Sequence, residues 1–262
     1  MYLSDEKEMY LLLSKMSAYK NKIKKAKEIL DNALKNSTNT ALSFSSGKDS
    51  VVLLHLAVQT GFMGTLVFFK YGLCTDIETP KENIELLKYY AELYDLKYKI
   101  IECLGEADCW EQIGRFVIFP TSDREKSVFN KTNFDYVIKS KKFEEENNID
   151  LSIIGMRKDE SRHRKLMLNK NGPIYQTKSR SSVTCCPISN FSNDDIWAYI
   201  FSNDLKYLSI YDYPYIDRRF NRNEITLLYN DSIVRHGGTY HYRKMYPDFF
   251  TWIKDRWGEV FI

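Results

Sequence analysis

Short apolar runs alternate with amphipathic segments along about the first 200 residues of the chain. The apolar runs are bounded by turn residues and predict five buried strands, at 40–45, 65–71, 97–102, 151–155 and 183–188. The segments between them predict helices over 49–61, 79–96, most of 107–148 and a stretch after Ser192, which Ser192 and Asp195 cap. This alternation favours an α/β fold with a doubly wound, mostly parallel five-stranded sheet that carries helices on both faces.

The two ends of the chain follow a different pattern. Residues 4–35 show apolar residues at helical spacing and predict one long N-terminal helix. From residue 204 onward the sequence is irregular, aromatic and basic until a last helix near 246–257. We therefore expect one α/β domain over 1–203, with a C-terminal extension over 204–262 packed on it.

Composition narrows the class of protein. The 262 residues are 44% hydrophobic and 28% charged, with a formal net charge of +3, as in a globular protein. The opening "MYLSDEKEMY" lacks a signal-peptide pattern, and no apolar run reaches the roughly 18 residues of a membrane span. Five cysteines without a CxxC pair favour a reducing compartment, so we expect a cytoplasmic protein.

Positive charge is concentrated in one stretch. Residues 157–180 hold eight Lys and Arg residues against Asp159 and Glu160, a net charge of +6. A solvated basic surface would show the same composition. Because the stretch directly follows a predicted strand, we favour an anion site.

The segment "SFSSGKDS", residues 43–50, joins the first strand to the first buried helix. Small residues at such a turn let backbone N–H groups approach an anion, and the helix N-terminus favours negative charge. It is not a Walker A loop, because Leu42 stands where that loop needs glycine and Asp49 follows the lysine. A single glycine also excludes the dinucleotide fingerprint, so the sequence predicts a different phosphate-binding turn.

This segment resembles the PP-loop, SGGKDS, of the adenine nucleotide α-hydrolase superfamily, with Ser46 in place of the first glycine. Three further stretches resemble the branch that contains PAPS reductases and ATP sulfurylase small subunits: "CTDIETP" (74–80), "GMRKDESRHR" (155–164) and "CCPISNFSNDDIWAYI" (185–200). Phe191 replaces the first tryptophan of the last pattern. The resemblance covers roughly residues 38 to 200 and implies a Rossmann-like, HUP-type fold.

The resemblance assigns two groups of residues. Those expected to bind ATP, its Mg²⁺ or a related sulfonucleotide are Ser43, Ser45, Ser46, Gly47, Lys48, Ser50, Asp76, Gly155, Glu160 and Ser161. Those expected to act in catalysis are Lys48, Asp49, Arg157 and Arg164. Arginine suits a transferred phosphate or sulfate because it keeps its charge and binds both oxygens at once.

Simpler interpretations stay open for several of these residues. Arg157 and Arg164 could be surface arginines, and Glu160 could be an ordinary salt-bridge partner. Asp49 could only stabilise the first turn of its helix. For Asp76 a plain loop acid is the favoured interpretation, and the sequence does not identify a metal ligand.

The cysteines depart from the related patterns. Sulfonucleotide reductases use a cysteine near the C-terminus, and this chain has none after Cys186. Iron–sulfur relatives pair a Cys–Cys with a downstream CxxC, where this chain offers only Gly238 and His241, so we expect no Fe–S cluster. Cys185 and Cys186 are candidate persulfide acceptors, although two half-buried apolar residues are the favoured interpretation.

Three functions remain. The first is an ATP pyrophosphatase that transfers AMP to an oxyanion. Its most specific form incorporates sulfur into DNA with a cysteine desulfurase partner, as in the Dnd and Ssp type phosphorothioation systems. Basic residues of the tail, from Arg218 to Lys244, suit such a nucleic-acid partner. The others are a sulfonucleotide reductase or ATP sulfurylase small subunit, and a non-catalytic nucleotide-binding subunit. An oligomer is compatible with each of them.

Overall fold

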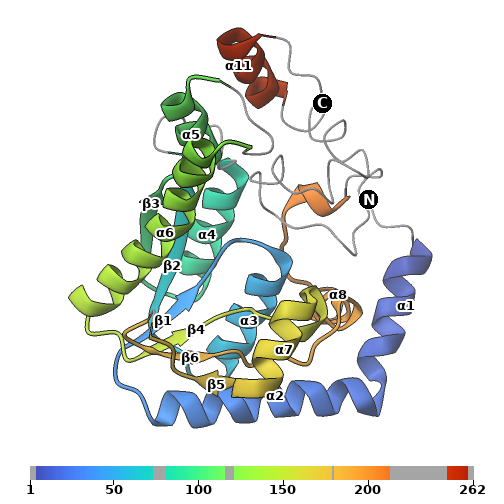
Figure 1. Ribbon diagram of the computed structural model, residues 1–262. Coiled ribbons are helices and arrows are strands. Elements are labelled where there is room, and N and C mark those ends of the chain that lie inside the picture. Colours follow the sequence, from blue (N-terminus) through green and yellow to red (C-terminus); the bar gives the residue numbers. More distant parts are fainter. Residues whose placement is uncertain (1–3, 73–80, 116–120, 179, 213–246, 259–262) are drawn as a thin grey trace.

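The computed structural model describes residues 4–72, 81–115, 121–178, 180–212 and 247–258 (Figure 1). Asp76, Cys74 and the predicted basic cluster of the tail lie outside these ranges. No helix in the described part of the chain is both long and apolar enough to cross a membrane.

Six strands form one sheet in the order β3-β2-β1-β4-β6-β5. Their bounds are β1 Thr40–Ser43, β2 Thr65–Tyr71, β3 Tyr98–Cys103, β4 Leu151–Ile153, β5 Ile174–Tyr175 and β6 Val183–Cys185. All neighbours are parallel except β5 and β6. The predicted α/β class and mostly parallel sheet are confirmed. The predicted number of five strands is wrong, because β5 has only two residues and is too short to show a strand periodicity.

The described helices account for most of the remaining chain. The α-helices are α1 Ser4–Lys15, α2 Ser17–Lys35, α3 Lys48–Gln59, α4 Lys81–Leu93, α5 Glu106–Ile113, α6 Asp123–Glu146, α7 Arg162–Asn171, α8 Asn193–Ser202 and α11 Pro247–Trp257. The 3₁₀ helices are η1 Lys158–Glu160 and η2 Ser209–Asp212. The predicted capping of α8 is confirmed: Ser192 Oγ accepts the Asp195 N–H, and Asp195 accepts the Ser192 N–H.

The two faces of the sheet are covered by different helices. Leu42 and Leu66 point into the main core, which also takes buried residues from α2, α3, α4 and α8. The neighbouring residues Ala41 and Val67 point to the other face, where Phe143 of α6 covers them. This alternation follows from the two-residue period of a strand. The predicted helical layers on both faces are therefore present.

The single helix predicted over residues 4–35 is wrong, because the chain bends at Met16. Met16 has an extended backbone (ψ 142°), and α1 and α2 run in different directions from it (Figure 1). Helix α1 packs on α8, where Tyr10 stacks on Phe201 with ring centroids 5.8 Å apart. Helix α2 instead buries Leu30 in the main core. The apolar spacing continues through the bend, so the sequence contains no breaker that would reveal it.

The order of the strands determines where a ligand can bind. The chain leaves β1 to form β2 on one side of it, and later returns to form β4 on its other side. The carboxyl ends of β1 and β4 are thus adjacent at the point where the strand order reverses. In parallel sheets this position is where ligands bind. The turn after β1 is residues 43–50, which the sequence singles out.

The buried carboxylate of Glu144 connects α6 to β4 and to residues 180–182, which precede β6. Glu144 is 2% exposed and accepts hydrogen bonds from Ser152 Oγ at 3.1 Å, Arg180 at 2.7 Å and the Ser182 N–H at 3.2 Å. Arg180 is also largely buried, so each charge depends on the other for compensation.

We predict that Glu144→Gln lowers the free energy of unfolding by about 3 kcal/mol, because Arg180 loses its anionic partner. Glu146→Gln is the matched control: Glu146 is exposed and lies 3.6 Å from Lys142, a contact worth about 0.3 kcal/mol. Urea unfolding of both variants measures the difference. Equal losses in the two variants would contradict the structural role of Glu144.

Candidate functional site

The turn after β1 has an unusual backbone. Ser46 has φ of 63°, in the left-handed region, and Gly47 is extended and precedes the first residue of α3. The Ser46 hydroxyl donates to the Asn83 carbonyl at 2.6 Å. This bond offsets the conformational cost of a non-glycine residue in the left-handed region. The turn therefore accommodates serine at the position where the resembling motif has glycine.

Two other serines of the turn form hydrogen bonds within it. Ser50 Oγ donates to the Gly47 carbonyl at 2.8 Å, and Ser45 Oγ accepts the Gly47 N–H at 3.4 Å. Ser45 is exposed, Ser50 is buried, and Ser43 is the last residue of β1. These contacts order the loop whose N–H groups begin α3, as an anion-binding turn requires.

Three charged side chains meet at the start of α3. Lys48 Nζ lies 3.0 Å from one carboxylate oxygen of Asp49, and Arg157 Nε donates to the other at 2.5 Å. Lys48 and Arg157 are each 4% exposed. Burial by itself would raise the pKa of Asp49, but the attraction of the two cations outweighs it and holds that pKa below its ordinary value. Asp49 therefore stays ionised and joins the turn after β1 to the loop after β4.

The loop after β4 brings the other predicted residues to this place. Gly155 packs directly on α3, since an added Cβ would lie 3.6 Å from the Asp49 carbonyl. Glu160 accepts the Arg157 N–H at 2.8 Å and forms an ion pair with Arg164. The first contact is with the backbone of Arg157, so Glu160 holds the loop that carries Arg157 and orients the side chain of Arg164. Ser161 caps α7 by accepting the Arg164 N–H at 3.2 Å, which gives it a structural contact near the site.

The two predicted arginines have different surroundings. The Arg157 guanidinium is buried and also contacts Asp159 at 3.4 Å. The Arg164 side chain is 34% exposed. Arg157 is therefore held by the protein, whereas Arg164 retains access to solvent and to a bound molecule.

Tyr211 is a residue of the site that the sequence analysis missed. It lies in η2, is 1% exposed, and its hydroxyl accepts the backbone N–H of Lys48 at 3.2 Å. Its ring is 5.6 Å from Lys48 Nζ. Because Tyr211 is one of many aromatic residues in an irregular segment, no local pattern marks it. Its hydroxyl occupies a position from which an anion could accept the same N–H.

The paired cysteines are buried in the structure. Burial, together with the neighbouring Cys186, raises the pKa of Cys185 to about 12. Burial also raises the pKa of Cys186 to about 11. Both thiols are therefore protonated at neutral pH, which opposes a role as nucleophile or persulfide acceptor.

The described residues do not provide a protein metal site. Within those ranges no group of three or more His, Cys, Asp or Glu side chains could hold a metal ion. The Asp49 carboxylate is already shared by Lys48 and Arg157. A role of Asp76 as a ligand is not tested, because Asp76 lies outside the described residues.

A known protein family matches the part of the chain that contains these site residues. Positions 39–217 match the phosphoadenosine phosphosulfate reductase domain family, a range that includes the turn at 43–50, Arg157 and α8. The chain belongs to this family. The match also includes Tyr211, although that residue follows the predicted domain boundary at 203.

Several curated proteins with similar sequences are named sulfate adenylyltransferase subunit 2. Sulfate adenylyltransferase subunit 2 of Aeromonas hydrophila is 25% identical over 203 residues, covering 74% of this chain and 66% of that protein. The same subunit of Zymomonas mobilis is 26% identical over 185 residues, covering 66% and 60%. The chain thus spans less than two thirds of the length of these family relatives.

Two solved structures share the fold. PAPS reductase from Candida auris, in a phosphate complex, has a TM-score of 0.54 at 17% identity, over 83% of this chain and 95% of that chain. The U34-tRNA thiolase NcsA from Methanococcus maripaludis, with its 4Fe–4S cluster, has a TM-score of 0.51 at 16% identity, over 88% and 79%. At these identities the likeness shows the family fold alone.

The geometry of Ser46 gives a testable prediction. Ser46→Ala loses the hydrogen bond to Asn83 and keeps a side chain in the left-handed region, so we expect a loss of about 2 kcal/mol in the free energy of unfolding. Ser46→Gly loses the same bond but gains backbone freedom, so its loss is expected to be smaller by about 1 kcal/mol. Urea unfolding measures both. A glycine variant less stable than the alanine variant would contradict the left-handed backbone.

The carboxylate of Asp49 gives a prediction about pH. We expect Asp49→Asn to unfold with about 3 kcal/mol less free energy than the wild type at pH 7, because two buried cations lose their partner. Since the pKa of Asp49 is lowered in the folded state, this contribution is present above the ordinary value of 3.8 and is lost as the pH falls through the lower folded pKa.

The midpoints of urea unfolding, measured for the wild type and Asp49→Asn across this pH range, test the predicted pH dependence. Asp31→Asn serves as the control, because Asp31 pairs with Lys35 on the exposed surface of α2. A difference between wild type and Asp49→Asn that does not shrink in acid would contradict the ionised state of Asp49.

Proposed function

We propose that the protein is an ATP pyrophosphatase that cleaves ATP between the α and β phosphates and transfers AMP to an oxyanion. The observation that carries this proposal is the buried Lys48 at a left-handed turn, located where the strand order reverses. A buried lysine beside backbone N–H groups at a helix N-terminus suits a pyrophosphate. Membership of a sulfonucleotide-using family supports an adenine nucleotide as the substrate.

The proposed reaction needs only ATP and the acceptor. An oxygen of the acceptor attacks the α-phosphorus, a new P–O bond forms, and the bond from the α-phosphorus to the bridging oxygen breaks. Pyrophosphate leaves with the electron pair. Lys48 and the N–H groups of the turn stabilise the charge that develops on it, while Asp49 holds Lys48 in place.

We propose different roles for the two arginines. Arg157 is enclosed by acidic partners and positions the loop after β4, so we propose it as a positioning residue. Arg164 is partly exposed and is the arginine proposed to contact the transferred group or the acceptor. Glu160 orients the Arg164 side chain and holds the backbone at Arg157. ATP is proposed to enter with Mg²⁺, for which the described residues supply no ligand set.

Surface charge supports a large anionic acceptor. Helix α7 carries Arg164 and presents exposed cations at Arg162, Lys165 and Lys170. Such a row suits a nucleic-acid backbone better than a single free sulfate. We therefore propose DNA phosphate as the acceptor, with sulfur supplied by a cysteine desulfurase, since Cys185 and Cys186 are buried and protonated.

Sulfate is the second candidate acceptor. It is favoured by the similarity to sulfate adenylyltransferase subunit 2, whose name implies a further subunit. Sulfonucleotide reduction is disfavoured because the cysteines of the described part are buried. A nucleotide-binding subunit without turnover is disfavoured by the intact contacts of Lys48, Asp49 and Arg157.

Product analysis tests the proposal. With ATP and Mg²⁺ we expect pyrophosphate rather than orthophosphate, and Lys48→Ala is expected to lower its rate at least about a hundredfold through the loss of charge stabilisation. Lys35→Ala is the matched control, because Lys35 is exposed near the amino end of β1, away from the turn. Its rate should equal that of the wild type.

Added acceptors separate the candidates. Stimulation by duplex DNA that is lost in Arg162→Ala/Lys165→Ala/Lys170→Ala supports the nucleic-acid acceptor, whereas stimulation by sulfate alone supports sulfate. Nucleotide binding with no product under any condition would contradict the enzyme proposal. Sulfite release from PAPS would replace it with sulfonucleotide reduction.

A further inference from the structure

The outer face of α1 is apolar. Met9 and Leu12 of α1 are 52% and 59% exposed, and Met16, the residue that follows α1, is 55% exposed. Their spacing places the three side chains on one side of α1. The opposite side packs on α8 through Tyr10. These three residues therefore form an apolar stripe that the described part of the chain does not cover.

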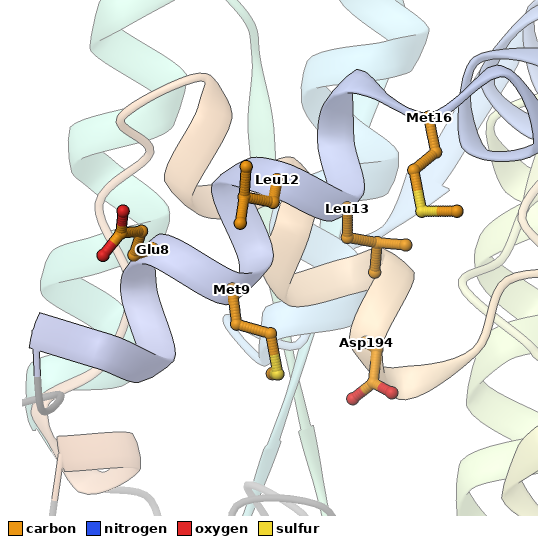
Figure 2. A pocket seen from close by; sticks show the side chains of 6 residues that line it. All are labelled: Glu8, Met9, Leu12, Leu13, Met16 and Asp194. Carbon is orange, nitrogen blue, oxygen red and sulfur yellow. The ribbon is translucent and has the colours of Figure 1, made fainter.

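The stripe borders a shallow groove between α1 and the start of α8. Figure 2 shows its lining, which consists of Glu8, Met9, Leu12, Leu13, Met16 and Asp194. The side chains of Met9 and Leu13 come from α1, Met16 is the residue that follows α1, and Asp194 comes from α8 (Figure 2). An apolar floor with two acidic residues at its edge favours an apolar partner that carries positive charge beside its contact residues.

Helix α1 itself has that pattern. With Met9 and Leu12 at the contact positions of a heptad, Glu8 and Lys15 both take the same flanking position, seven residues apart. Both are exposed, and neither forms an ion pair within the part of the chain that the structure describes. When two such helices pair antiparallel, Glu8 of each lies beside Lys15 of the other. A parallel pair would instead place Glu8 beside the apolar Leu13.

We propose that the outer face of α1 docks antiparallel on α1 of a second copy of this chain. The contact is isologous: each copy offers the same stripe, and the two Glu8–Lys15 pairs set the direction. The stripe lies on a single short helix, so the interface is small and the dimer depends on protein concentration. The nucleotide site lies at the carboxyl ends of β1 and β4 and is not part of this contact.

Charge reversal tests the pairing. Glu8→Lys and Lys15→Glu each place like charges opposite one another twice, so each variant should dimerise about tenfold more weakly than the wild type. The double variant Glu8→Lys/Lys15→Glu restores both pairs and should dimerise like the wild type. An equimolar mixture of the two single variants should form a heterodimer, because one then carries two lysines and the other two glutamates.

Sedimentation velocity over a concentration series measures each dissociation constant. Leu12→Glu should be monomeric, while Ile138→Glu, at an equally exposed apolar residue of α6, should keep the wild-type dimer. Circular dichroism confirms that these surface variants are folded, and pyrophosphate release from ATP should be equal in all of them.

Three outcomes would overturn the proposal. They are a wild type that stays monomeric at the highest soluble concentration, a dimer that survives Leu12→Glu, and single variants that do not associate with one another when mixed. A dimer lost in Ile138→Glu instead would place the contact on α6. Because the readout is the mass in solution, its failure is separate from any failure of the ATP reaction.

Discussion

The carboxylate of Asp49 connects the two halves of the site. It accepts from Lys48 on its own helix and from Arg157 on the loop after β4, and it does so at the one place where the sheet reverses its strand order. Two cations this well buried are tolerated only because an anion compensates them. This contact holds the loop after β4 against the start of α3.

The sequence predicts the sheet and the turn because both depend on local patterns. The buried strands appear as short apolar runs between turn residues, and the small residues at 45–47 mark the turn between β1 and α3. At Ser46 the backbone is left-handed, and the bond to Asn83 explains how serine takes the place of glycine there. The structure also selects among the interpretations of Asp49, since its two partners give it more than a first-turn role.

The features that the sequence does not predict depend on contacts between residues that are far apart in the chain. The bend at Met16 arises because α1 and α2 pack on different surfaces, and β5 is too short to have a period. Tyr211 reaches Lys48 from 163 positions away and carries no motif. Arg157 is buried and Arg164 is partly exposed. The sequence motif contains both arginines but does not show which of them is buried.

The central claim is that the N–H groups that open α3 bind the phosphates of a nucleotide. Backbone amide resonances, followed during titration with pyrophosphate, test it most directly. We expect the amides of Gly47 and Lys48 to shift first and saturably, as the phosphate replaces the Tyr211 hydroxyl at the Lys48 N–H. Saturable shifts confined to α7, with Gly47 and Lys48 unchanged, would contradict it.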